Sequence, residues 1–339
     1  MARRWRIARR VLVIAAIAVA AIIIMGPRIE TDTTIRFDPA TIGPDVETYL
    51  QRREGQFADL RAGLQKQIVW ADPATKARTA LSIVYVHGFS ASPGELRPLP
   101  DQVAAGLDAN LFFTRLAGHG RSGDALGEAS VNQWINDLAE AVEIGRRLGD
   151  RVVLVGTSTG ASLVTWGAAQ PALMADVVGA VLISPNFGVQ APGSFILTQP
   201  WGGHIAEWLT GPRRGFTPRN DLHARFWTSD YPTRALLPMA ALVELANDAE
   251  IHNIQIPALF VYSSEDRIVR PDRTEAVAAR WGAATQTLLV GENGDASNHV
   301  IAGDALSPET TDSLARAIVD YLRAVASPGG AGRASLENR

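Results

Sequence analysis

Short apolar runs alternate with amphipathic stretches along most of this chain. Runs with the length and composition of buried strands occupy residues 67–70, 79–87, 110–115, 152–156, 179–184, 257–263 and 285–290. Apolar residues at helical spacing lie between or after them, at residues 93–106, 130–148 and 308–324. Ser130 with Gln133 predicts a capping box at the start of the second of these helices. The alternation predicts an α/β fold, with a mostly parallel central sheet flanked by helices.

Residues 186–250 interrupt this alternation with a segment rich in aromatic residues, prolines and glycines. Such an insertion is expected to form a cap over an apolar pocket. We therefore predict one large α/β domain over residues 67–325, with the cap inserted in it. A polar N-terminal extension, residues 29–66, is predicted to contain a helix over residues 44–64, and residues 326–339 are predicted to be a disordered tail.

The first 28 residues have a pattern of their own. An arginine-rich start precedes an unbroken apolar run, residues 11–25. As a helix this run would be about 22 Å long, a little short of a hydrocarbon core of roughly 30 Å. We expect residues 1–28 to be an uncleaved anchor in the inner (cytoplasmic) membrane, with the rest of the chain on the periplasmic side, because basic residues stay in the cytoplasm. A cleaved signal peptide, which would leave a secreted or periplasmic protein, is the competing interpretation, and a buried core helix is a third.

Composition narrows the range of functions. With 339 residues, 47% apolar and 20% charged, the chain can form a large core, which excludes global disorder. Its net charge is −3, and without the five arginines of the first ten residues it would be about −8, which argues against a nucleic-acid surface. There are no cysteines, so disulfides, thiolate catalysis and cysteine-ligated metals are excluded. The composition does not indicate an oligomeric state.

The strongest chemical signal is the pentapeptide Gly156-Thr157-Ser158-Thr159-Gly160, which lies between a predicted strand and a predicted helix. Strand, sharp turn and helix are the context of a nucleophile elbow. The turn crowds the backbone, so the two flanking positions must lack a side chain. Ser158 would then stand at the carboxyl end of the strand, near the positive end of the following helix. A glycine- and serine-rich turn without catalytic function is the alternative interpretation.

A second signal follows the strand at residues 79–87, where the chain reads His87-Gly88-Phe89. Acyl transfer places negative charge on a carbonyl oxygen, which needs two hydrogen-bond donors. We predict that these donors are the backbone N–H groups of Phe89 and Thr159. The imidazole of His87 is expected to bond to its own loop. His119, Trp201 and Trp227 are candidate substrate contacts, and the alternative for His119 is a structural residue near the pocket rim.

Asp266 and His299 complete the predicted site. Asp266 closely follows the strand at residues 257–263, and at a strand end a carboxylate can accept the Nδ1 proton of a histidine. His299 follows the last strand, and it is the only histidine after that carboxylate. The order Ser158, Asp266, His299 is that of an α/β-hydrolase triad. Glu265 is the alternative acid, and Asp295 is interpreted as a candidate cap of the histidine loop.

This ordered set of motifs resembles the α/β-hydrolase superfamily over about residues 67–325. It is most similar to the bacterial carboxylesterase and monoacylglycerol-lipase-like branch, also described as serine aminopeptidase-like. The motifs that carry the resemblance are His87-Gly88-Phe89, Gly118-His119-Gly120-Arg121-Ser122, the Ser158 pentapeptide, Ser264-Glu265-Asp266 and Asn298-His299-Val300. Thr157 departs from the histidine usual in that branch, and Thr159 from the usual methionine, leucine or glutamine.

The expected activity is hydrolysis of carboxylic esters through an acyl-enzyme on Ser158, with no metal or organic cofactor. An N-terminal anchor beside an aromatic cap favours lipid-like or medium- to long-chain esters such as monoacylglycerols. The expected partners are an ester substrate and a membrane contacted through residues 11–25, but no nucleic acid. Acyl transfer, peptidase action and a non-catalytic, membrane-tethered binding protein on the same fold remain alternatives.

Overall fold

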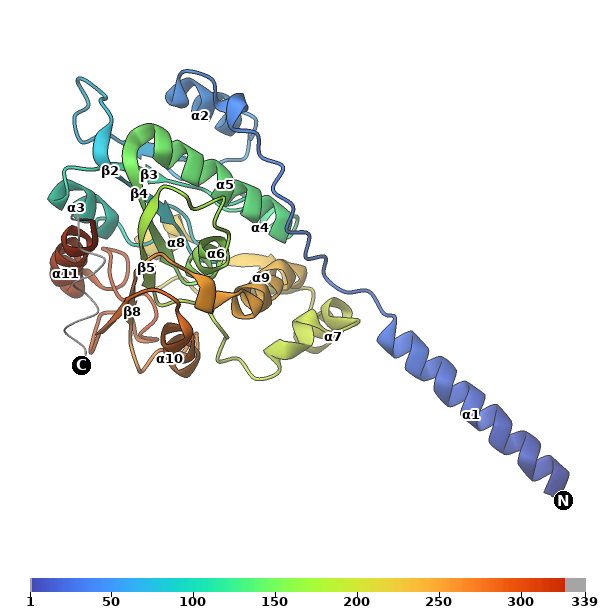
Figure 1. Ribbon diagram of the computed structural model, residues 1–339. Helices are drawn as coiled ribbons and strands as arrows, with labels where there is room; N and C mark the ends of the chain where they lie inside the picture. Colours follow the sequence, from blue (N-terminus) through green and yellow to red (C-terminus); the bar gives the residue numbers. More distant parts are fainter. Residues whose placement is uncertain (1, 327–339) are drawn as a thin grey trace.

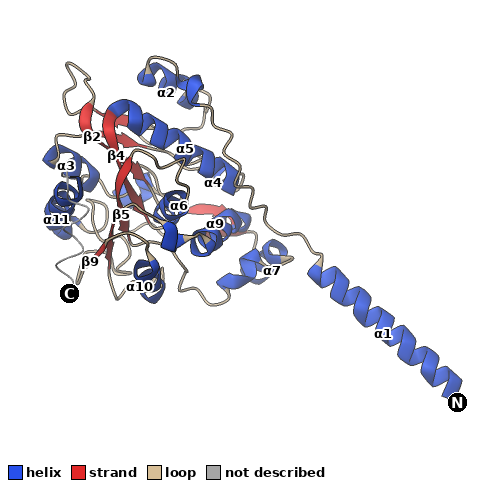
Figure 2. Cartoon of the chain, in the orientation of Figure 1, coloured by secondary structure: helices blue, strands red, loops and turns tan. Residues whose placement is uncertain are grey.

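The fold is built on one central sheet, seen in a computed structural model that describes residues 2–326 (Figures 1 and 2). Seven strands follow one another in the order β1-β3-β2-β4-β5-β8-β9. Only β1 runs antiparallel to its neighbour; the other pairs are parallel. The strands are β1 (Gln67–Val69), β2 (Thr79–Val86), β3 (Asn110–Phe113), β4 (Gly149–Thr157), β5 (Val177–Ile183), β8 (Ala258–Tyr262) and β9 (Thr285–Leu289). The predicted α/β fold is confirmed. Of the disordered tail predicted over residues 326–339, Ala326 is instead the last residue of a helix, and residues 327–339 lie outside the described residues.

Helices cover both faces of this sheet (Figure 1). Side chains of a strand point alternately to its two faces, so β2 and β4 contribute to two separate cores. Ile83, Tyr85, Val153 and Val155 pack on the side of α3 (Leu99–Gly106) and α11 (Pro308–Ala326). Val84, Val86, Val152 and Leu154 pack on the side of α5 (Val131–Leu148), α6 (Thr159–Ala168) and α10 (Pro271–Arg280).

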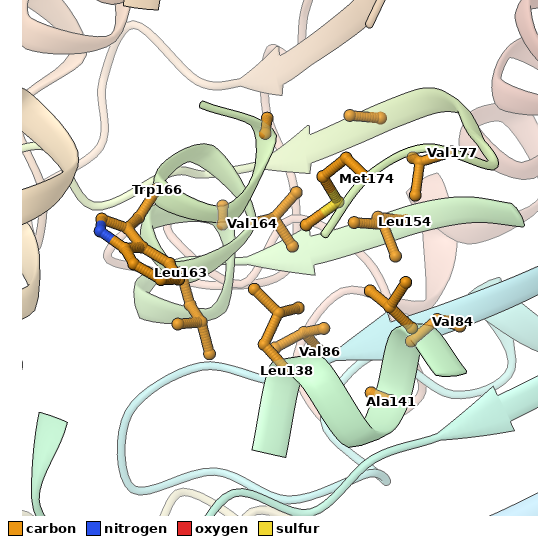
Figure 3. Packing of buried hydrophobic residues seen from close by; sticks show 14 of the residues in the cluster. Val84, Val86, Leu138, Ala141, Leu154, Leu163, Val164, Trp166, Met174 and Val177 are labelled. Atoms are coloured by element: carbon orange, nitrogen blue, oxygen red, sulfur yellow. The ribbon is translucent and has the colours of Figure 1, made fainter. Parts of the chain in front are cut away.

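The second core fixes the helix that follows Ser158. Figure 3 shows Leu163, Val164 and Trp166 of α6 packed with Leu138 of α5 and the strand residues beneath them. The two helices approach closely at Gly167, where an added Cβ would lie 2.6 Å from the Leu138 side chain. The capping box predicted at Ser130 and Gln133 is present at the start of α5. The start of α6 is therefore held on a rigid layer.

Between β5 and β8 the chain leaves the sheet and folds above its carboxyl edge. This segment contains η2 (Ser194–Thr198), α7 (Gly202–Thr210), β6 (Arg213–Gly215), α8 (Asp221–Phe226), β7 (Asp230–Pro232), η3 (Thr233–Ala235), α9 (Leu236–Asp248) and η4 (Ile251–Asn253). Strands β6 and β7 form a separate antiparallel pair. A hydrogen bond of 2.7 Å from the Thr228 N–H to the Ser90 carbonyl ties the segment to the loop after β2.

The N-terminal extension packs beside α5, but its helix is shorter than predicted. A 3₁₀ turn, η1 (Pro39–Ile42), is followed by α2 (Val46–Glu54), which ends at Gly55 instead of continuing to residue 64. Glycine is about 1 kcal/mol less favourable than alanine inside a helix, and the buried ion pair of Glu54 with Arg115 directs the chain toward the sheet at that point. Outside this extension, a further short helix, α4 (Gly123–Leu126), follows the loop after β3.

The membrane anchor expected at residues 11–25 is contradicted, and with it the inner-membrane location. The segment is helical, as α1 (Ala2–Ile24), and it projects from the rest of the chain (Figure 1). Across residues 2–326, however, no helix combines the length and the apolarity that a bilayer span requires. The physical reason is that the first turns of α1 carry arginines, and the remaining apolar part spans only about 22 Å of the roughly 30 Å needed.

Candidate active site

Ser158 occupies a strained turn between β4 and α6. Its φ of 51° and ψ of −119° are unusual for a residue with a side chain. Strain of this kind costs about 1–3 kcal/mol and persists only where the surroundings enforce it. The Ser158 N–H donates to the Ile183 carbonyl at 2.9 Å, and the Ser158 carbonyl accepts from the Asn186 N–H at 3.1 Å. Strand β5 and the chain after it thus hold the turn that presents the hydroxyl.

The two glycines of the pentapeptide are required by close backbone contacts. A Cβ at Gly156 would lie 2.8 Å from the Ala161 Cα. A Cβ at Gly160 would overlap the carbonyl oxygens of Val86 and His87 at the end of β2. The structure therefore confirms the reason inferred from the sequence, that the elbow has no room for side chains at its flanks.

Gly160→Ala is expected to destabilise the protein by about 3 kcal/mol or more, because the clash is with backbone atoms that cannot rotate away. Chemical denaturation of the two proteins measures this difference in the free energy of unfolding. Gly291→Ala is the matched control, since no atom lies within 4 Å of its added Cβ, and we expect a change below about 0.5 kcal/mol. Equal stability of the two variants would contradict this account of the elbow.

His299 joins Ser158 and Asp266 in an unbroken hydrogen-bonded chain. Its Nε2 lies 3.0 Å from the Ser158 Oγ, and its Nδ1 lies 2.7 Å from the Asp266 Oδ2. A carboxylate can only accept, so Nδ1 carries the proton and the lone pair of Nε2 faces the hydroxyl. The other oxygen of Asp266 accepts from the N–H groups of Ile268 and Val269, at 2.8 and 2.9 Å. The arrangement can remove a proton from Ser158.

The loop that carries His299 is organised by Asp295, which is almost fully buried. Its Oδ2 accepts from the N–H groups of His299 and Val300, both at 3.0 Å, and Oδ1 pairs with Arg219 of the insertion. Burial raises the pKa of this carboxyl, but hydrogen bonds from Ser297, Val300 and His299 outweigh burial and hold it at about 2. Asp295 is therefore a charged cap of the loop and makes no contact with the His299 ring nitrogens.

The rate of any reaction that uses His299 as a base should fall in acid. Burial lowers the pKa of the imidazole, but the Asp266 carboxylate raises it more, so that the net pKa lies above its ordinary value of about 6.5. Only the neutral ring can accept a proton, so we expect kcat/KM to be lost as pH falls through a midpoint above about 6.5. A pH profile of kcat/KM for an ester whose ionisation is constant measures this midpoint. A midpoint below 6 would contradict the expectation.

Two backbone N–H groups belong to residues that line the same cavity as Ser158. Those of Phe89 and Thr159 have no hydrogen-bond partner among residues 2–326, and both residues line the cavity that holds Ser158. His87 orients the first of them: its Nε2 accepts from the Leu116 N–H at 3.1 Å, so its Nδ1 carries the proton and donates to the Gly88 carbonyl at 2.9 Å. In a trans peptide the N–H points opposite the carbonyl, which turns the Phe89 N–H away from His87.

Ser158 and His299 open into a cavity of about 380 Å³ between the sheet edge and the insertion. Its wall is mostly apolar and includes Phe89, Phe216, Trp227, Tyr231, Met239 and Leu306. Trp227, predicted to contact substrate, lies in this wall. His119 does not, because it is fully buried behind Phe89 against Trp134, and burial holds its pKa well below the ordinary value. Trp201 also lies outside the cavity, at the start of α7, where its indole N–H donates to the Ile22 carbonyl at 3.0 Å.

One residue of the cavity, Glu95, was not predicted from the sequence. It lies in the turn before α3, within a stretch predicted to be helical, and its side chain is folded inward to the cavity. A single acidic residue in a polar turn carries no local signal of burial, so only the three-dimensional packing reveals it. Within the part of the chain that the structure describes, no group of three or more His, Asp or Glu side chains is arranged to hold a metal ion.

Comparison with known proteins extends these observations. The model of the alpha/beta hydrolase family matches residues 83–328. A thermostable monoacylglycerol lipase from Bacillus sp. (strain H-257) is 26% identical over 208 residues, which cover 61% of this chain and 79% of the relative.

Solved structures show the same fold at lower identity. One, from a report on two metagenome-derived lipolytic enzymes, has a TM-score of 0.63 at 19% identity and covers 78% of this chain and 99% of its own. A soluble variant of monoglyceride lipase from Saccharomyces cerevisiae, in complex with a substrate analog, has a TM-score of 0.61 at 13% identity, with 78% and 92% covered. Because the family model matches more than half of this chain, the chain belongs to the alpha/beta hydrolase family.

Proposed function

We propose that this protein is a carboxylic ester hydrolase that acts through an acyl-enzyme on Ser158. The observation that carries the proposal is the hydrogen-bonded chain from the Ser158 hydroxyl through His299 to Asp266, which opens into the mostly apolar cavity. The family to which the chain belongs and its relative from Bacillus, by its name a monoacylglycerol lipase, support this activity.

In the first half of the reaction, the Ser158 Oγ attacks the ester carbonyl carbon while its proton passes to the His299 Nε2. Asp266 holds the ring in the required tautomer and stabilises the imidazolium. The N–H groups of Phe89 and Thr159 bind the oxyanion; loss of one such donor typically costs about 2.7–4 kcal/mol. Collapse of the intermediate breaks the bond to the alkoxide, which leaves as the alcohol with the proton from Nε2.

In the second half, a water molecule attacks the acyl-enzyme and gives its proton to the His299 Nε2. The second tetrahedral intermediate expels the Ser158 Oγ, which takes that proton back, and the carboxylic acid leaves. The free enzyme is restored with the proton on Oγ and the lone pair on Nε2. The cycle uses only groups of this chain and water.

The lining of the cavity favours a substrate with a lipid-like acyl group. Most of the area of its wall is apolar, and aromatic and aliphatic side chains from both the sheet edge and the insertion contribute to it, which suits a medium or long acyl chain. In this proposal the insertion acts as the cap of the acyl site. The relative from Bacillus is by its name a monoacylglycerol lipase, and monoacylglycerols are accordingly the first substrates to test.

Labelling with a fluorophosphonate probe tests the proposal, because the probe reacts only with an activated serine. We expect the full chain to be labelled, and its Ser158→Ala and His299→Ala variants to be unlabelled while remaining folded by circular dichroism. A series of p-nitrophenyl esters from acetate to palmitate then tests the acyl group, with kcat/KM expected to rise toward medium or long chains. A folded wild-type protein that neither reacts with the probe nor hydrolyses any ester would contradict the proposed function.

A further inference from the structure

Glu95 is a buried carboxyl group that the reaction described above does not use. Its side chain is only 3% exposed. One carboxyl oxygen, Oε2, accepts from the Gly88 N–H at 2.7 Å and from the Tyr85 hydroxyl at 3.0 Å. The same hydroxyl is 3.1 Å from the Thr157 Oγ1, next to the nucleophile. The Oε2 atom therefore has its hydrogen-bond partners in strand β2 and in the loop that follows it.

The other oxygen, Oε1, has no hydrogen-bond partner among the described residues. It lies beside the nucleophile: a Cβ placed on Gly88 would be 2.8 Å from the Glu95 Oε1 and 3.1 Å from the Ser158 Cβ. Both residues line the same cavity. The wall of the cavity thus contains a carboxyl oxygen without a protein partner, on a residue that is itself almost fully buried, close to the position at which an ester must react.

We propose that Glu95 is a specificity-determining residue that hydrogen-bonds a free hydroxyl group of the ester substrate. The proposal rests on the proposed ester hydrolysis and narrows its substrates to hydroxyl-bearing esters, such as partial esters of a polyol. An ester that fills the cavity shields this oxygen from water, and a polar atom buried without a partner is costly. An ester without a hydroxyl should therefore bind less well than one that supplies the missing hydrogen bond.

A hydroxyl fits this position better than an ammonium group. Burial raises the pKa of Glu95 to about 7, so near neutral pH the carboxyl exists both with and without its proton. A hydroxyl can donate to the carboxylate or accept from the carboxylic acid, whereas an ammonium group can only donate. An ammonium group also needs further acceptors, and the other carboxylate that lines the cavity, Asp295, is already occupied by Arg219 and by the N–H groups of its own loop.

A matched pair of substrates tests the proposal. Monodecanoylglycerol and propyl decanoate share the acyl chain and a three-carbon alcohol, and they differ in the two free hydroxyls. We expect wild-type kcat/KM to favour monodecanoylglycerol by about tenfold or more. In Glu95→Met, which keeps the length of the side chain but cannot form the bond, the ratio should fall to within about twofold of one. Glu95→Gln, which keeps a polar group toward the cavity, should give an intermediate ratio.

The ratio separates recognition from support of the loop. Loss of structure lowers kcat/KM for both substrates equally and leaves their ratio unchanged, even in a sample that is only partly folded. Tyr85→Phe is the matched control, because at Glu95 it removes a bond to the satisfied oxygen and leaves Oε1 unchanged. The variant also removes the contact with Thr157, which does not involve Oε1, so its ratio should equal that of the wild type.

Three outcomes overturn the proposal. The first is an equal kcat/KM for both substrates in the wild type. The second is a ratio of the two kcat/KM values that is the same in Glu95→Met as in the wild type. The third is a preference for aminoacyl esters that Glu95→Gln abolishes, which would mean that the carboxyl group binds an ammonium group. In each of these the enzyme is labelled by the fluorophosphonate probe and hydrolyses esters, so the proposed function stands. Absence of both labelling and hydrolysis would instead refute the proposed function, and this proposal with it.

Discussion

Ser158→Ala is expected to lower kcat for ester hydrolysis by at least about 10⁴-fold without unfolding the protein. Every covalent step of the proposed reaction passes through the Ser158 Oγ, and an alanine leaves nothing to form the acyl-enzyme. That hydroxyl has one hydrogen-bond partner, His299, among the residues described, so its removal costs little stability. Steady-state hydrolysis of a p-nitrophenyl ester and a thermal unfolding curve measure the two effects.

Ser162→Ala is the matched control, one turn later on α6. Its hydroxyl is fully buried and donates to the Asn186 carbonyl at 2.6 Å, but it does not bond to His299. We expect this variant to lose about 1 kcal/mol of stability and to keep kcat within a few-fold of the wild type. If Ser158→Ala kept more than about one hundredth of the activity, another nucleophile would have to be sought.

The sequence indicated the elbow and the order of the triad because each depends on local features. Residues 152–160 contain the buried strand, the two glycines and the serine within one continuous stretch. The clash at Gly156 is with the adjoining Ala161, and the clash at Gly160 is with the neighbouring strand end. Residues placed directly after parallel strands meet at one edge of a sheet, whatever the order of the strands. This is why Ser158, Asp266 and His299 could be paired from their positions in the chain alone.

Features that depend on distant contacts were not predicted. The chain places β3 between β1 and β2, although β1 and β2 follow one another in sequence. Two misses have no such distant cause. The helix predicted over residues 93–106 begins only at Leu99, because Pro98 and Pro100 restrict its start, and α10 (Pro271–Arg280) was not recognised. Which aromatic residues face the cavity depends on how the insertion folds back, and so Trp227 lies in the wall while Trp201 contacts the chain near α1.

Asp266→Asn is expected to lower kcat by about 10⁴-fold while preserving the geometry of the site. The reason lies in the second oxygen of Asp266, which accepts from the N–H groups of Ile268 and Val269. In the variant the amide oxygen must take that place, so the amide NH₂ faces the His299 Nδ1. An NH₂ group can only donate, so the ring proton moves to Nε2, where it faces the Ser158 hydroxyl and blocks proton removal.

Measurement of kcat for Asp266→Asn, with Glu265→Gln as its control, checks this expectation. Glu265 is the neighbouring acid that the sequence left as an alternative, but its side chain is exposed, so kcat of its variant should stay within about twofold of the wild type. The acid limb of the residual Asp266→Asn activity should also move to lower pH, because the carboxylate that raises the His299 pKa is gone. Full activity in Asp266→Asn together with a large loss in Glu265→Gln would assign the acid to Glu265 and require a different position of the His299 ring.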